Sequence, residues 1–150
     1  MSDPIKPADR PGSLLFLCNH NIIRSPMAEA IAKHRLGRDV FVDSAGITTG
    51  TIDPFVTEVM GEWGIDISRH TPKKLVDVND SWVDLIITLS PQAHHIALLM
   101  ESVEAAEVLY WAAADPTVIQ GSRAQMVQAY RDVRDGIAAR IDEHFGIQAG

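Results

Sequence analysis

Short apolar runs alternate with longer amphipathic stretches along this chain. The first run, Leu14–Leu17, has no polar position, which suits a strand at the centre of a parallel sheet that is covered on both faces. The longer stretches repeat apolar residues at the three- and four-residue spacing of helices with one buried face. Strands are predicted over residues 14–17, 39–44, 82–89 and 107–111. Helices are predicted to begin at Ser25–Pro26, Asp53–Pro54, Ser90–Pro91 and about Ser122.

Alternation of strands and helices predicts an α/β fold, with three layers (α/β/α) and a four-stranded parallel sheet. The length of 150 residues suits one domain, expected over residues 13–150. Three prolines and mixed charges in residues 1–12 indicate a flexible N-terminal lead-in. Ligands of such sheets bind outside the carboxyl ends of the strands, and Cys18 stands at one of these ends.

Composition narrows the possible functions. The net charge of −7 argues against general binding to nucleic acid or to an anionic membrane surface. One cysteine excludes an internal disulfide and favours a cytoplasmic setting. No apolar stretch has the length of a membrane span, and metal-ligand spacings are absent, so neither a membrane anchor nor a metal or other cofactor is expected.

The segment from Cys18 to Pro26 concentrates the candidate chemistry. A strand ends at Cys18, and a helix is expected to start at Ser25–Pro26, with Ser25 as its cap. Unpaired amides at a helix start form a cradle for a tetrahedral anion, and Arg24 adds a two-pronged donor. The same positive field stabilises a nucleophilic thiolate. The alternative is a buried core thiol beside a surface arginine, and the spacing C-x5-R-[ST] between strand and helix favours the catalytic interpretation.

The run Cys18–Glu29 (CNHNIIRSPMAE) resembles the signature loop of the low-molecular-weight protein tyrosine phosphatases, and of arsenate reductases that share their fold. The resemblance continues at residues 44–46, 64–70, 84–88 and 115–116. It implies a hydrolase in which Cys18 is the nucleophile and Arg24 clamps the phosphate. The phosphate-binding loop would comprise Asn19, His20, Asn21, Ile22, Ile23, Arg24 and Ser25.

Two further roles in the loop follow from the resemblance. Ser25 would donate to the thiolate as well as cap the helix. Asn21 would hold the loop through its side-chain amide, with Ser44 as a supporting partner. Asn21 is otherwise an ordinary left-handed loop residue, and Ser44 a strand-end hydroxyl bonded to its own backbone.

Asp115 is the candidate acid and base. Cleavage of a phosphate ester needs a proton for the leaving oxygen, and release of the phosphocysteine needs an activated water. Three other Xaa-Pro pairs lead directly into predicted helices, but Asp115–Pro116 does not. Asp115 therefore has no obvious role as a helix cap. The alternative is a turn aspartate. The resemblance favours the catalytic role, because the Asp-Pro of these phosphatases carries the general acid.

The chain departs from the family pattern at three places. His20 stands where glycine is usual, and if that position needs a positive φ, histidine strains the backbone by roughly 1 kcal/mol or more. The alternative is that the ring faces the pocket and alters the thiolate or the fit of the substrate. Ile23 replaces a second cysteine of the loop. Thr117 and Val118 replace the aromatic residues that wall a phosphotyrosine ring.

Three functions are compatible with the sequence. The first is a cysteine-dependent phosphomonoesterase for a phosphorylated protein or small molecule, acting through a phosphocysteine. The second is arsenate reduction by Cys18 with an external thiol or glutaredoxin, since a relay through three cysteines is impossible here. The third is a non-catalytic module that binds an anion or a phosphoprotein.

Overall fold

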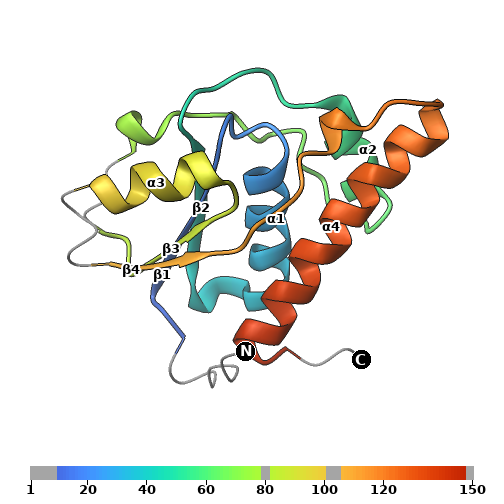
Figure 1. Ribbon diagram of the computed structural model, residues 1–150. Helices are drawn as coiled ribbons and strands as arrows, with labels where there is room; N and C mark the ends of the chain where they lie inside the picture. Colours follow the sequence, from blue (N-terminus) through green and yellow to red (C-terminus); the bar gives the residue numbers. More distant parts are fainter. Residues whose placement is uncertain (1–9, 79–81, 101–105, 148–150) are drawn as a thin grey trace.

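The structure, a computed structural model, describes residues 10–78, 82–100 and 106–147 (Figure 1). Its sheet has four parallel strands in the order β2-β1-β3-β4. The strands are β1 (Ser13–Cys18), β2 (Phe41–Gly46), β3 (Leu85–Thr88) and β4 (Glu107–Tyr110). The main helices are α1 (Arg24–Leu36), α2 (Pro54–Gly61), α3 (Pro91–Leu99) and α4 (Arg123–Phe145). Short 3-10 helices are η2 (Gly37–Asp39), η3 (Leu75–Asp77) and η6 (Pro116–Val118).

Helices cover both faces of the sheet, which confirms the three-layer α/β/α prediction. Alternate side chains of β1 point to opposite faces. Leu14 and Phe16 join the core beneath α1, α2 and α4, whereas Leu15 and Leu17 join the core beneath α3. β1 is buried along its whole length because it pairs with strands on both sides.

Two strands begin later than the sequence predicts. β2 starts at Phe41 because Gly37, with φ 65°, ends α1 and the chain then makes the turn η2. β3 starts at Leu85 because Ser13 Oγ accepts a hydrogen bond from the Asp84 amide and donates to the Trp82 carbonyl. Hydrogen bonds of the Ser13 side chain thus take the place of the first part of the strand predicted over residues 82–89.

Local capping starts three of the four helices as predicted. Asp53 accepts from the Phe55 amide at α2, and Ser90 accepts from the Ala93 amide at α3. Ser122 and Gln125 form a reciprocal capping box at α4. The start of α1 is different and belongs to the site described below.

Two further predictions concern the N-terminal lead-in and the absence of a membrane span. Of the predicted lead-in, residues 10–12 are described: Arg10 Nη2 donates to the Phe145 carbonyl, and Gly12 contacts Asp84 and Phe41. Residues 1–9 lie outside the described part of the chain. Across the helices that are described, none combines the length and apolar composition that crossing a bilayer requires.

The chain topology gathers the candidate residues at one edge of the sheet. The β1–α1 loop and the segment after β2 lie at the carboxyl ends of parallel strands. In Figure 1 the orange segment after β4 runs past α1 before it reaches α4. Arg24, the first residue of α1, donates from Nη1 to the carbonyl of Ala113 in that segment, 3.1 Å away.

Candidate active site

Cys18 ends β1 with its side chain 2% exposed. Two polar groups of the following loop and helix reach its sulfur. The Asn21 amide donates to Sγ at 3.3 Å, and Ser25 Oγ lies 2.8 Å from Sγ. Donors at these distances, together with the start of α1, stabilise negative charge on the sulfur. The surroundings of Cys18 therefore suit a nucleophilic thiolate rather than an inert core thiol.

The predicted capping role of Ser25 is wrong. α1 begins one residue earlier, at Arg24, with Ile23 in the cap position and no side-chain cap. The Ser25 hydroxyl instead contacts Cys18 Sγ and accepts from Asn21 Nδ2 at 2.8 Å. Because these contacts occupy the hydroxyl, the first amides of α1 are left without a protein cap and remain available to an anion.

Asn21 stands at the centre of the loop and is fully buried. Its φ of 58° is left-handed, which asparagine adopts more readily than most residues. Nδ2 donates to Ser25 Oγ and to Ser44 Oγ, both at 2.8 Å. Oδ1 accepts from the Lys73 amide at 3.0 Å and lies 3.1 Å from His70 Nε2. The pairing with Ser44 that the sequence suggests is therefore present, within a larger network.

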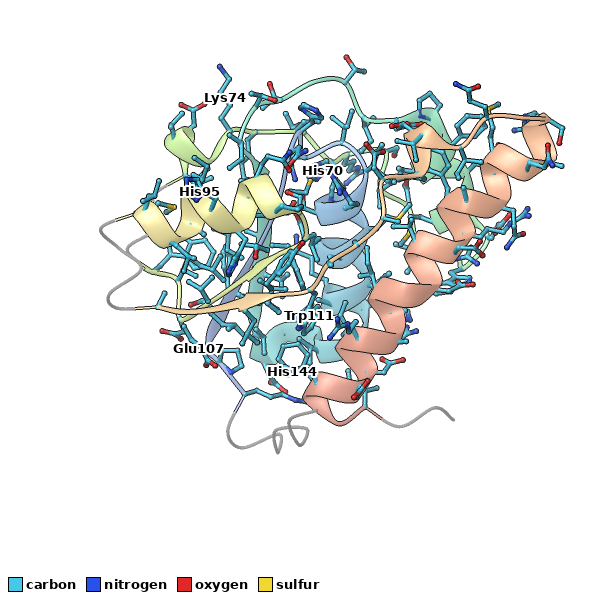
Figure 2. All side chains as sticks on the ribbon, viewed as in Figure 1. His70, Lys74, His95, Glu107, Trp111 and His144 are labelled. Atoms are coloured by element: carbon cyan, nitrogen blue, oxygen red, sulfur yellow. The ribbon has the colours of Figure 1, made fainter. Side chains whose placement is uncertain are left out.

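Glu29, His70 and Lys73 extend this network, and none of them was among the site residues expected from the sequence. Ser44 Oγ donates to Glu29 Oε1 at 2.5 Å, and His70 Nδ1 lies 3.8 Å from the same oxygen. Figure 2 shows His70 beside the start of α1. Burial lowers the pKa of His70, and the negative charge of Glu29 offsets part of this effect. A signal for Glu29 was available, because it lies one helical turn after Ser25 on the same face.

Arg24 and Asp115 lie at the same small pocket. The pocket holds about 120 Å³ and is lined by Cys18, His20, Ile22, Ile23, Arg24, Asp115 and Thr117. Arg24 is 8% exposed and Cys18 is buried, so these two form its floor, while the more exposed His20, Asp115 and Thr117 form its rim. Ligand pockets for drug-sized molecules hold about 300–1,000 Å³, so this one suits a compact anion.

Asp115 does have a capping role, contrary to the sequence prediction. It is the N-cap of η6, and its Oδ1 accepts from the Thr117 amide at 2.9 Å and from Thr117 Oγ1 at 2.6 Å. The prediction missed this role because the helix that Pro116 opens is only three residues long. Burial raises the pKa of Asp115, but the Thr117 hydrogen bonds and the charges of Arg24 and His20 outweigh it and hold that pKa below its ordinary value.

The condition under which His20 would strain the backbone, a positive φ, is not met. Among the non-glycine residues that the structure describes, Asn21 alone has a positive φ. The histidine side chain is exposed and lines the pocket, with Nδ1 2.6 Å from Thr48 Oγ1. The residue that stands in place of the family's glycine therefore contributes a ring to the rim without a left-handed backbone.

A larger cavity lies behind the Asp115 segment. It holds about 390 Å³ between residues 111–119 and α4, and its lining includes Leu89, Trp111 and Ile137 but neither Cys18 nor Arg24. Figure 2 places Trp111 well away from His70 and the start of α1. This apolar cavity lacks a nucleophile, so the smaller pocket is the candidate active site.

The pocket combines a nucleophile, a cation, free helix amides and a carboxyl group. Such a set can bind a tetrahedral oxyanion, attack its central atom and exchange a proton with a leaving oxygen. Over the described ranges, no three or more His, Cys, Asp or Glu side chains are arranged to hold a metal ion.

Comparison with known proteins agrees with this geometry. The family model of low molecular weight phosphotyrosine protein phosphatase matches residues 13–145. An arsenate reductase of Halalkalibacterium halodurans is 34% identical over 128 residues, which cover 85% of this chain and 91% of that protein.

Solved structures of related proteins resemble this chain in both fold and sequence. An arsenate reductase in the phosphate binding state has a TM-score of 0.75 and 27% identity, covering 89% of this chain and 96% of that one. A low molecular weight protein tyrosine phosphatase from T. tengcongensis has a TM-score of 0.74 and 25% identity, covering 87% and 95%. The present chain belongs to the low molecular weight phosphotyrosine protein phosphatase family, whose fold phosphatases and arsenate reductases share.

Proposed function

We propose that this protein reduces arsenate by thiolate chemistry at Cys18, with an external thiol or glutaredoxin as reductant. The observation that carries the proposal is the compact pocket in which Cys18 and Arg24 form the floor and Asp115 lies at the rim. Its size suits an inorganic oxyanion. The naming of relatives such as the 34% identical Halalkalibacterium halodurans protein as arsenate reductase supports the same choice.

The proposed first step is displacement at arsenic. The Cys18 thiolate attacks arsenate, a sulfur–arsenic bond forms, and an arsenic–oxygen bond breaks. The departing oxygen takes a proton and leaves as water, and Asp115 is the candidate donor. Arg24 and the amides of residues 19–25 hold the remaining oxygens as charge develops on them.

The proposed second step moves the electrons. An external thiolate attacks Cys18 Sγ, the sulfur–arsenic bond breaks, and its electron pair stays on arsenic, which leaves as arsenite. Cys18 is now in a mixed disulfide, and a second external thiol restores it. An internal route is closed because Cys18 is the single cysteine of the chain. This chemistry needs a reducing compartment, so we also propose a cytoplasmic location.

Arsenite formation tests the proposal. Reduced protein would be supplied with arsenate and either glutathione, glutathione with glutaredoxin, or thioredoxin with its reductase. We expect turnover with at least one of the first two systems, loss of turnover in Cys18→Ser, and none in the thioredoxin system. Folded, fully reduced protein that forms no arsenite in any system would exclude this function.

Phosphomonoester hydrolysis is the second candidate, and the position of Asp115 favours it. Attack by Cys18 would break the phosphorus–oxygen bond, with Asp115 protonating the leaving oxygen and then taking a proton from the water that cleaves the phosphocysteine. Hydrolysis of para-nitrophenyl phosphate with chelator present tests it. Turnover that disappears in Cys18→Ser and falls steeply in Asp115→Asn would favour hydrolysis, and no turnover by reduced wild type would exclude it.

A further inference from the structure

The rim of the pocket carries an imidazole that neither reaction above uses. His20 lines the pocket with Cys18, Arg24, Asp115 and Thr117. Its Nδ1 lies 2.6 Å from Thr48 Oγ1, so one ring nitrogen is held by a hydroxyl from the segment after β2. The position of the ring at the rim is therefore fixed by a contact, although the side chain is exposed to solvent.

The support beneath His20 is rigid backbone. The Ile47 amide donates to the Cys18 carbonyl at 3.1 Å, and the Thr48 amide donates to the Asn19 carbonyl at 2.9 Å. These bonds hold the segment after β2 against the anion loop. Gly46 permits the approach, because a Cβ there would lie 2.6 Å from the carbonyl carbon of His20. Backbone hydrogen bonds, which depend on neither side chain, therefore place Thr48 next to His20.

The other walls of the pocket offer no large ring on which an aromatic substrate could stack. No Phe, Tyr or Trp side chain is among the described residues that line the 120 Å³ pocket. Across the rim, Asp115 is tied down by Thr117, and the next residue, Val118, is 70% exposed. The charge of His20 contributes to lowering the pKa of Asp115, which fits two polar groups facing the same small space.

We infer that His20 is a specificity-determining residue that narrows the rim and restricts the pocket to compact oxyanions such as arsenate and phosphate. The ring occupies space that an aryl group would need, and it offers a polar edge to the oxygens of a small anion. This inference rests on the proposed function, because it assumes that the same pocket binds the substrate.

Equilibrium binding tests the inference without any turnover. Isothermal titration would compare inorganic phosphate with phenylphosphonate, which carries an aryl group and has no ester bond to cleave. Wild type should bind phosphate more tightly. His20→Ala should shift the ratio of the two dissociation constants toward phenylphosphonate by roughly tenfold or more, since a small change in the fit of a pocket is worth about 10–200-fold in discrimination.

Two further variants separate specificity from damage to the loop. Thr48→Val keeps the His20 side chain but removes the hydroxyl that fixes its position. The ratio of the two dissociation constants should therefore shift in the same direction as in His20→Ala, by a smaller factor. His95→Ala removes an exposed histidine of α3 away from the pocket and should leave the ratio unchanged. Urea unfolding confirms that each variant is folded.

The two proposals fail in different ways. A folded His20→Ala with the wild-type ratio, or a wild type that binds phenylphosphonate as tightly as phosphate, would overturn the role of His20 while leaving the proposed function standing. Folded, reduced wild type that binds neither anion would overturn both.

Discussion

The Ser25 hydroxyl lies 2.8 Å from the Cys18 sulfur, and the two residues are seven positions apart in the chain. The contact exists because the loop folds back on itself around Asn21, whose Nδ2 also donates to Ser25 Oγ. An oxygen that accepts from Asn21 keeps its own proton, and the sulfur at 2.8 Å is a nearer acceptor for it than the Ala45 carbonyl at 3.4 Å. Ser25 is therefore placed to stabilise a thiolate rather than to cap α1.

Removing this hydroxyl should slow the reactions of Cys18. A hydrogen bond to a charged group contributes about 1.5–3 kcal/mol, so Ser25→Ala should alkylate with iodoacetamide roughly tenfold or more slowly at pH 7. Alkylation would be followed by intact mass. Ser122→Ala, which removes the cap of α4, should destabilise the fold without slowing alkylation. Equal rates in Ser25→Ala and wild type would show that the hydroxyl does not stabilise the thiolate.

Asn21 combines a backbone role and a side-chain role, and two variants separate them. Asn21→Gly keeps the left-handed conformation but leaves Ser25, Ser44 and Lys73 without their partner. Asn21→Ala adds strain at φ 58°. We expect both to lose most activity and Asn21→Ala to unfold about 1 kcal/mol more easily than Asn21→Gly. Urea denaturation gives the comparison, and equal stability of the two would contradict the strain argument.

The contrast between local and distant contacts explains how much of this site the sequence predicts. The anion loop and the nearby Arg24 follow from signals within a dozen residues: an apolar run, a helix start and the spacing between them. The contacts of Thr48 and Lys73 were not predicted because both residues reach the loop from segments after β2, and a single sequence does not give the register that brings them there. Of the two roles expected for Ser25, the contact with Cys18 is present and the cap is not. The capping rule considers the local backbone alone, whereas the sulfur of Cys18 and the side-chain amide of Asn21 occupy the hydroxyl.

Thr117 should control the pH dependence of Asp115. Its hydrogen bonds favour the ionised carboxylate, so Thr117→Ala should raise the pKa of Asp115. If Asp115 acts as an acid, it then remains protonated to higher pH. The descending limb of kcat/KM for para-nitrophenyl phosphate should move up by on the order of one pH unit. In an Asp115→Asn background the same change should have no effect. A limb that moves down, or stays in place, would argue against Asp115 as the titrating acid.

His70 should make the fold less stable in mild acid. Burial lowers its pKa in the folded state, so the unfolded chain takes up the proton first as pH falls below the ordinary value of about 6.5. Stability should fall from pH 7.5 to 5.5 and level off below the folded-state pKa. His144, whose pKa burial also lowers, contributes with the same sign.

The effect of His70 can be isolated by substitution. His70→Gln should have a smaller loss of urea midpoint between pH 7.5 and 5.5 than wild type, because one of the two histidines no longer titrates. His95→Gln, at an exposed position of α3, should lose as much of its urea midpoint between pH 7.5 and 5.5 as wild type does. A wild-type midpoint that does not change over this range, or an undiminished loss in His70→Gln, would show that His70 is not the source.

The most direct test of the account is the state of Cys18 after a single turnover. Reduced protein would be mixed with arsenate and limiting glutathione, and its intact mass measured after acid quenching. The account predicts a mixed disulfide of one glutathione on Cys18 that requires arsenate, is absent in Cys18→Ser, and forms together with arsenite. No arsenate-dependent adduct, or an equal adduct without arsenate, in protein whose thiol is shown to be reduced and accessible would contradict reduction at Cys18.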